Sequence, residues 1–331
     1  MKIIIMGDQM KKKITIWLCL LLWMPIFVFA YSKEVVLGGE TLGIEIKSKG
    51  ILVVGFYKVN GNYINQQLSV GDKIMEIAGT KVDDVNQMIE LVDKNMQDNY
   101  VKVLIERDKK KFTTKLELSN FNGTYRTGLY VKGDITGIGT LTYIDAQTKV
   151  YGALGHVINE SKSNRRIEVK EGFTYKAKVT SFIRSNDGSP GSKNADINYK
   201  NLFGTLEKNT NYGIFGKVSG NFDNEDKIEV GNIDDVLLGE AYLYTTNLEN
   251  KIDKFKINIL SVNKTSKDKN YFFEVVDEKC LKMSGGIVQG MSGSPIVQNN
   301  KIIGAVTRVL IDDVKKGYGI NIVTMLEEGE R

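Results

Sequence analysis

Glycines divide the second half of this sequence into short apolar segments, and this pattern restricts the fold more than any other feature. Residues 129–131, 137–141 and 257–262 are typical of these segments. Patterns with the period of a long amphipathic helix are few, although residues 323–328 fit a final helical turn. Many short strands joined by turns are typical of an all-β barrel or sandwich. We therefore expect residues 119–331 to form a mainly β domain.

A basic and then apolar segment stands near the amino terminus. Lysines at positions 11–13 precede an apolar run over residues 14–30. Such an arrangement is typical of a secretion signal or a membrane anchor. The run is at the short limit for crossing ~30 Å of hydrocarbon, which leaves both alternatives open. We expect residues 1–30 to direct export and contact the membrane, so that the protein acts outside the cytoplasm.

The charge balance argues against several classes of partner. The net charge is +5, from 45 basic and 40 acidic residues. Residues 1–30 hold four lysines and one aspartate, an excess of three, so the remainder carries only +2. A nucleic-acid-binding protein would concentrate basic residues on one face, and we predict no such partner. One histidine and two cysteines do not suit a Cys/His zinc site, so we predict neither metal nor cofactor.

Residues 34–118 combine short strands with a helix. Gly71 and Asp72 turn the chain into a short apolar strand, and Ala78 and Gly79 form a hairpin-like turn. Residues 100–107 alternate as a closing strand. One helix face is indicated by apolar side chains at i, i+3, i+4 and i+7, namely Val85, Met88, Ile89 and Val92.

This order of elements, above all the segment from Gly71 to Val82, resembles a PDZ domain. The resemblance implies that an extended segment or a peptide carboxyl terminus adds as a strand, with the carboxylate at the N–H groups around Gly43. The peptide-binding residues are then Leu42, Gly43, Ile44, Glu45 and Ile46. The alternative is a small α+β packing domain without a ligand.

A second motif, Gly-Met-Ser-Gly-Ser-Pro at residues 290–295, precedes an apolar strand pattern at residues 302–306. This turn resembles the nucleophile loop of chymotrypsin-like serine proteases, which implies that Ser292 is the nucleophile. Glycines let the backbone turn tightly, and they allow the N–H groups of Gly290 and Ser292 to point at a developing oxyanion. The alternative is an ordinary glycine-serine turn.

The only histidine, His156, follows a glycine-framed run at residues 152–155. A serine hydroxyl needs an adjacent base to remove its proton, and an imidazole with a pKa near ~6.5 suits that task. We therefore predict His156 as the general base. An acidic residue is expected to orient the imidazole. Asp277, in the segment before the Ser292 loop, and Asp145 are both candidates, and their spacing does not choose between them.

Together these motifs resemble the stage IV sporulation protein B peptidases of endospore-forming bacteria. The matching stretches are residues 125–131, 137–142, 153–156, 209–216 and 286–296. The resemblance implies a PDZ domain at residues 34–118, followed by a chymotrypsin-like serine peptidase domain at residues 119–331. It assigns the roles of nucleophile, base and acid to Ser292, His156 and Asp277.

The same resemblance implies a function in sporulation signalling. The peptidase would cleave itself near the amino terminus, and would then cleave a membrane-bound regulator of sigma-factor processing between the two forespore membranes. One alternative is an envelope quality-control protease of the HtrA kind, although those relatives carry the protease domain before the PDZ domain. Another is a non-catalytic PDZ scaffold, which would tolerate the loss of Ser292 or His156.

Overall fold

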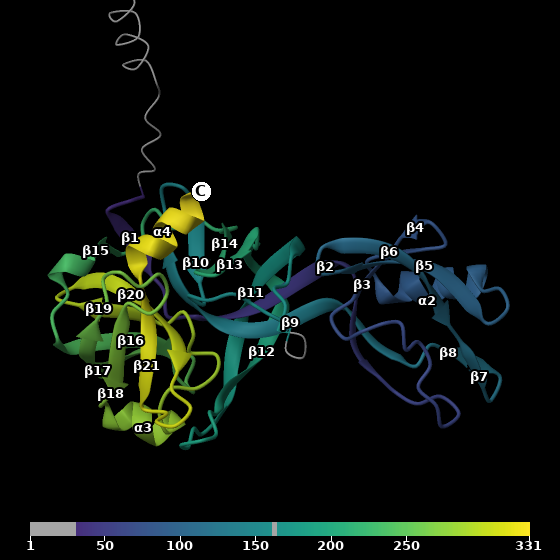
Figure 1. Cartoon of the computed structure of the whole chain (residues 1–331). Helices are drawn as coiled ribbons and strands as arrows, with labels where there is room; N and C mark the ends of the chain where they lie inside the picture. Colours follow the sequence, from purple (N-terminus) through teal and green to yellow (C-terminus); the bar gives the residue numbers. More distant parts are fainter. Residues whose placement is uncertain (1–30, 161–163) are drawn as a thin grey trace, which may run out of the picture. The chain divides into compact units, whose positions relative to one another are not determined.

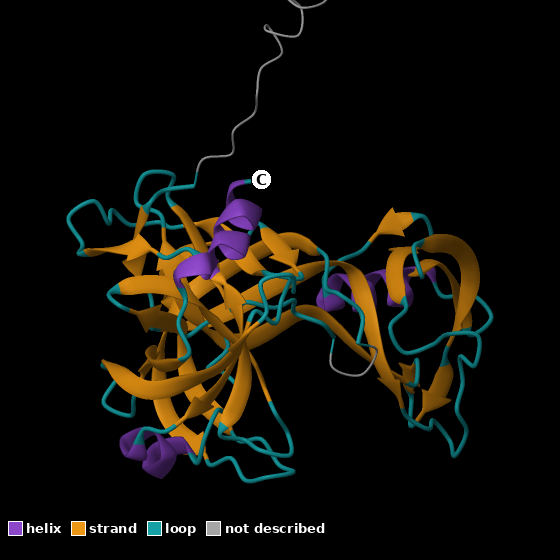
Figure 2. Cartoon of the chain, turned by 60° about the vertical axis from the view of Figure 1, so that its left-hand side comes forward, coloured by secondary structure: helices purple, strands orange, loops and turns teal. Residues whose placement is uncertain are grey.

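The computed structural model describes residues 31–160 and 164–331. Strands make up most of this part of the chain (Figure 2), which confirms the expected mainly β fold. The predicted export segment, residues 1–30, lies outside the described residues. Among the residues that are described, no helix is both long enough and apolar enough to cross a membrane.

Six strands of the carboxyl-terminal half close into an antiparallel barrel (Figure 1). In pairing order they are β16 (Gly239–Thr246), β17 (Ile252–Val262), β18 (Tyr271–Val275), β21 (Lys316–Asn321), β20 (Lys301–Val309) and β19 (Pro295–Gln298). The pairing of β19 with β16 completes the ring. Because alternate side chains of a strand face inward, the ring encloses a core that includes Phe255, Tyr271 and Phe273.

A second ring is built around a long strand pair. Its strands in pairing order are β9 (Leu129–Ile144), β2 (Thr41–Phe56), β11 (Val169–Ile183), β12 (Ser192–Thr205), β14 (Gly213–Lys217) and β10 (Val150–Ala153). A single bridge between Gly204 and Val218 joins the end of β12 to the end of β14. Leu42, Ile46 and Tyr151 lie in its core.

Short strands extend and join the two rings. They are β1 (Glu34–Leu37), β13 (Lys208–Thr210) and β15 (Lys227–Val230). β1 pairs with β9 of one ring and with β15, and β15 runs parallel to β20 of the other ring. The strand ladders are therefore continuous from one ring to the other.

A smaller unit, here called the α+β lobe, precedes the carboxyl-terminal ring in the chain. It contains β3 (Lys73–Ile77), β4 (Thr80–Lys81), α2 (Val85–Asn95), β5 (Tyr100–Arg107), β6 (Lys110–Glu117), β7 (Ser119–Phe121) and β8 (Thr124–Arg126). The expected helix and closing strand are confirmed as α2 and β5. Met88 and Val92 are buried, whereas Ile89 is 54% exposed, so the apolar face of the helix is narrower than its spacing indicates.

One long strand connects the lobe to the barrels and changes the expected domain boundary. Residues 42–46, which we expected within the PDZ-like domain at residues 34–118, belong to β2, which runs from the second ring into the lobe (Figure 1). The chain bends there at Gly50, with φ +77°, and the pairing of β2 with β9 shifts register. Residues 34–46 therefore belong to the barrels rather than to the lobe.

Three short helical elements complete the described fold. They are η1 (Ile233–Asp235), α3 (Glu278–Ser284) and α4 (Ile322–Glu330). α4 confirms the helical turn expected at residues 323–328 and extends it by a few residues. Its buried side chains Met325 and Leu326 pack into a core with Tyr143 and Phe215.

Candidate active site

Ser292 lies in the loop that leads into β19 and is framed by two glycines in the left-handed region. Gly290 has φ +95° and Gly293 has φ +92°, angles that glycine adopts without steric cost. A Cβ atom added at Gly293 would overlap the carbonyl oxygen of Thr140. These angles and this close approach confirm the prediction that glycines let the backbone turn tightly here.

Two peptide units of this loop are held by their carbonyl groups. The Gln289 carbonyl accepts from the N–H of Lys193 at 2.8 Å, and the Met291 carbonyl accepts from the N–H of Ser294 at 2.9 Å. Since C=O and N–H point in opposite directions across a trans peptide, these contacts orient the N–H groups of Gly290 and Ser292. Within the described residues neither of these N–H groups donates a hydrogen bond, so both are available to an acceptor.

His156 follows β10 after two residues in the left-handed region. Leu154 and Gly155 both have φ +68°, which is strained for leucine and is a feature that clusters at functional sites. Nδ1 of His156 lies 2.9 Å from the carbonyl oxygen of Val157. A carbonyl can only accept, so Nδ1 carries the proton and Nε2 keeps its lone pair. This is the tautomer that a base acting through Nε2 requires.

Burial lowers the pKa of His156 below its usual value of 6.5. The hydrogen bond with the Val157 carbonyl opposes this shift, and the charge of Arg308 adds to it. The imidazole is therefore neutral near pH 7, and its free nitrogen can accept a proton.

His156 and Ser292 line the same cavity, of about 380 Å³. Gly290 also lines it, so the predicted nucleophile, base and oxyanion donors meet at one place. The Ser292 hydroxyl donates to the Thr307 carbonyl at 3.2 Å. The hydroxyl hydrogen must therefore turn away from the Thr307 carbonyl before it can pass to the imidazole. The rest of the lining is largely apolar, with Ile44, Ile46, Ile135, Ile138 and Ile158.

Neither candidate acid lies at this cavity. Asp277 is the N-cap of α3, where its carboxylate accepts from the N–H of Cys280 at 3.0 Å and of Lys256 at 3.1 Å. Asp145 is fully buried, and one of its oxygens accepts from the N–H of Gln147 at 2.9 Å. Both carboxylates bind local backbone groups, and among the described lining residues there is no aspartate or glutamate. The prediction that Asp277 or Asp145 lies beside His156 is therefore corrected, because the structure places neither carboxylate at the cavity.

The residues that complete the site were not identified from the sequence. The carbonyl of Val157 has the place expected for an acid, and the carbonyl of Thr307 holds the Ser292 hydroxyl. Every residue carries a carbonyl, so no pattern of residue types marks these two. The position of Val157 directly after the only histidine is the one available signal.

The predicted peptide-binding residues are covered on both sides. Leu42, Gly43, Ile44, Glu45 and Ile46 pair with β9 along one edge of β2 and with β11 along the other. A peptide that adds as a strand needs a free edge. The prediction of a peptide-binding groove beside residues 42–46 is therefore wrong. The cause is the continuity of β2, which places this segment inside the barrels.

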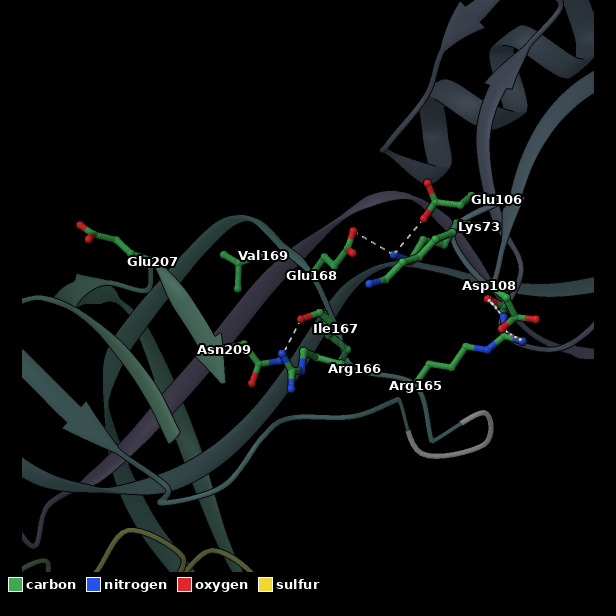
Figure 3. Close-up of a pocket in the computed structure, with 12 residues that line it drawn as sticks. Lys73, Glu106, Asp108, Arg165, Arg166, Ile167, Glu168, Val169, Glu207 and Asn209 are labelled. Carbon is green, nitrogen blue, oxygen red and sulfur yellow. Dashed lines mark hydrogen bonds and ion pairs between the residues drawn. The ribbon is translucent and has the colours of Figure 1, made fainter. Parts of the chain in front are cut away.

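A larger cavity, of about 650 Å³, lies where the α+β lobe meets the start of β11 (Figure 3). Several of its charges are paired: Lys73 binds Glu106 at 3.7 Å and Glu168 at 3.3 Å. Arg165 binds Asp108 at 3.0 Å. No serine, cysteine or histidine is among its described lining residues. In the described ranges no three His, Cys, Asp or Glu side chains gather to hold a metal ion.

Comparison with known proteins identifies a family. The family model described as SpoIVB peptidase S55 matches residues 123–326. No curated protein sequence matches the chain.

Several solved structures are similar to the chain at low identity. The Rv3671c protease from M. tuberculosis, active form, is 14% identical over 59% of this chain and 73% of that one, with a TM-score of 0.34. The HtrA-type protease AlgW with a decapeptide is 13% identical over 60% of this chain and 52% of that one, with a TM-score of 0.33. The serine endoprotease from Yersinia pestis is 14% identical over 59% of each chain, with a TM-score of 0.31.

Proposed function

The chain belongs to the SpoIVB peptidase S55 family of serine peptidases, and from this membership we propose that Ser292 and His156 carry out its peptide-bond hydrolysis. The observation that supports these roles most strongly is their shared cavity, which Gly290 also lines; within the described part of the chain, the N–H groups of Gly290 and Ser292 donate no hydrogen bond. Nucleophile, base and oxyanion donors are the groups that acyl transfer requires.

The proposed reaction begins when the Ser292 hydroxyl hydrogen turns away from the Thr307 carbonyl. Oγ of Ser292 attacks the substrate carbonyl carbon while the hydroxyl proton passes to Nε2 of His156. The N–H groups of Gly290 and Ser292 stabilise the negative oxygen. The imidazolium then gives its proton to the leaving amine as the C–N bond breaks. Water, deprotonated by the same imidazole, hydrolyses the acyl-enzyme and restores the serine.

A backbone carbonyl takes the orienting role in this proposal. The Val157 carbonyl accepts from Nδ1–H, so it fixes the tautomer and favours the imidazolium that forms during attack. A carbonyl lacks the full charge of a carboxylate and stabilises the cation less. We therefore expect the base to have a low pKa and the reaction to be slower than with an acidic third member.

The substrate is proposed to bind as an extended strand along β9. Residues 135–138 pair with β2 on one side, and none of the described strands pairs with their other edge. Ile135, Thr136, Gly137 and Ile138 all line the cavity. An extended segment could add to this edge through main-chain hydrogen bonds. The isoleucine-rich lining favours an apolar side chain next to the bond that is cut.

The biological setting is proposed from the sequence and the family. We propose an exported peptidase, secreted or held by residues 1–30, that acts between the forespore membranes. It would cleave itself near the amino terminus and then a membrane-bound regulator of sigma-factor processing. The order of elements in the α+β lobe supports a PDZ-like module, with its ligand elsewhere than beside Leu42–Ile46 of β2.

Mass spectrometry of the purified full chain tests the catalytic proposal. Wild-type protein is expected to yield fragments from self-cleavage, and Ser292→Ala is expected to stay intact. Ser294→Ala is the matched control, because Ser294 lies in the same turn but its buried hydroxyl has no hydrogen-bond partner in the described structure. Fragments from Ser292→Ala at the wild-type rate would disprove the assignment of the nucleophile.

A further inference from the structure

A buried lysine lies behind the nucleophile loop. Lys193, near the start of β12, is 2% exposed. Its Nζ donates to three hydroxyl oxygens, those of Thr245 at 2.8 Å, Thr41 at 3.2 Å and Thr140 at 3.4 Å. An ammonium has three N–H donors, so each of them has one acceptor. The three threonines come from β16, β2 and β9, and so from both barrels.

Among the described residues, no carboxylate forms an ion pair with this ammonium. The groups that the three strands and the nucleophile loop present to Nζ are hydroxyls, and burial alone lowers the pKa of Lys193 to about 7. Glu40, beside Thr41 in the chain, has Lys176 and Glu225 as its charged neighbours. A buried cation without a counter-ion destabilises the folded state. Its presence therefore calls for a role other than stability.

Two separate contacts join Lys193 to the peptide units around Ser292. Its backbone N–H holds the Gln289 carbonyl, and this contact orients the N–H of Gly290. The hydroxyl of Thr140, which accepts from Nζ, donates to the Gly290 carbonyl at 2.7 Å. The backbone N–H of Thr140 also donates to the Ser292 carbonyl at 3.0 Å.

The ammonium determines which way the Thr140 hydroxyl points. Because Nζ–H occupies a lone pair of this oxygen, the hydroxyl hydrogen is directed to the Gly290 carbonyl. Without the ammonium, the hydroxyl is free to rotate and the carbonyl can lose its donor. The Gly290 backbone would then be held less firmly, and with it the oxyanion donors.

We propose that Lys193 is a positioning residue of the peptidase site, which holds the oxyanion donors in place through Thr140 and adds a buried positive charge behind them. In a site of low dielectric such a charge favours the oxyanion of the transition state over the neutral substrate. This inference rests on the proposed function, because it assumes that Ser292 is the nucleophile.

The rate at which a fluorophosphonate labels Ser292 in the full chain is a suitable measurement. In that reaction Oγ forms a bond to phosphorus, fluoride leaves with its bonding electrons, and the serine proton passes to His156. The negative phosphoryl oxygen of the transition state uses the oxyanion donors. The rate therefore reports their position without knowledge of the natural substrate.

Four single variants and one double variant separate positioning from simple stability. Lys193→Met and Thr140→Val should label about 10- to 100-fold more slowly, somewhat less than the effect of deleting an oxyanion donor. Thr140→Ser, which keeps the hydroxyl, should label within about threefold of wild type. Thr245→Val is the matched control, since it removes an acceptor of Nζ that does not touch the loop. The double variant Lys193→Met with Thr140→Val should be no slower than the slower single variant.

The melting temperature distinguishes this role from a structural one. Lys193→Met should melt at or above the wild-type temperature, because a buried cation is removed, and yet label more slowly. Labelling of Lys193→Met at the wild-type rate would overturn this inference but not the proposed function. A slower labelling rate that accompanies a lowered melting temperature would do the same. Absence of labelling at Ser292 in the wild-type chain would overturn both the inference and the proposed function.

Discussion

At the scale of single residues, the environment of His156 determines the pH range in which the peptidase works. Burial lowers its pKa below 6.5, and the base must be neutral to accept the serine proton. Activity should therefore rise with pH through a midpoint below 6.5. The pH profile of fluorophosphonate labelling measures this midpoint. A midpoint above 6.5 would contradict the described environment of the imidazole.

The role of Asp277 can be decided by one isosteric substitution. As the N-cap of α3 it binds backbone N–H groups through its carboxylate, and asparagine caps a helix about as well as aspartate. Asp277→Asn should therefore keep both melting temperature and labelling rate. Asp277→Ala, which removes the cap, should lower the free energy of unfolding by about 1 kcal/mol.

The competing prediction for Asp277 is much larger. If its carboxylate were the acid that orients His156, Asp277→Asn would reduce the rate by about 10⁴-fold, as loss of that group does in a Ser-His-Asp triad. A loss of that size at unchanged stability would reinstate Asp277 as the third catalytic member.

At the scale of elements, the nucleophile turn depends on Gly293. Gly293→Ala forces a Cβ into the Thr140 carbonyl and should abolish labelling of Ser292. Gly188→Ala is the matched control, because Gly188 also has a positive φ, +82°, but has nothing within 4 Å of an added Cβ. Gly188→Ala should lower the free energy of unfolding by only ~1 kcal/mol, because alanine is strained in a left-handed backbone conformation. Equal effects of the two changes on labelling would show that the steric contact is unimportant.

Elements with a clear period could be predicted from the sequence, and those that depend on long-range pairing could not. α2 follows from its apolar spacing, and β5 from its alternation. Gly50 lies inside β2 rather than between two strands, because β9 pairs with the residues on both sides of it. Only the partner strand shows that the segment is continuous.

The same limit applies to the site. Ser292, His156 and the glycines of the loop are marked by residue type, and the structure brings them to one cavity. The carbonyl of Val157 and the contact of Lys193 with Thr140 depend on backbone direction and on residues far apart in the chain. Residue types alone therefore favoured an aspartate for a role that a backbone group can fill.

At the scale of the whole molecule, β2 couples the α+β lobe to the barrels. Residues Tyr31–Glu330 form one compact unit. Within the lobe, Arg107 forms a two-pronged ion pair with the fully buried Asp72, at 2.7 and 2.6 Å. Arg107→Met leaves this carboxylate without its cation and should lower the free energy of unfolding by about 3–5 kcal/mol.

This loss should affect the barrels as well. Because one strand serves both parts, we expect a single calorimetric transition, at a lower temperature in Arg107→Met, with labelling of Ser292 lost at the same temperature. Arg126→Met is the control, since Arg126 is exposed on the lobe and its guanidinium lies over the ring of Phe121. Two separate transitions, with labelling retained after the first, would show that the parts unfold independently.

The central claim, that Ser292 acts with His156 at the shared cavity, is tested most directly by locating the fluorophosphonate adduct. Peptide mass spectrometry of the labelled full chain should find the adduct on Ser292, and His156→Gln should show little or none in the same time. An adduct on another residue, or an equal yield on Ser292 in His156→Gln, would contradict the claim.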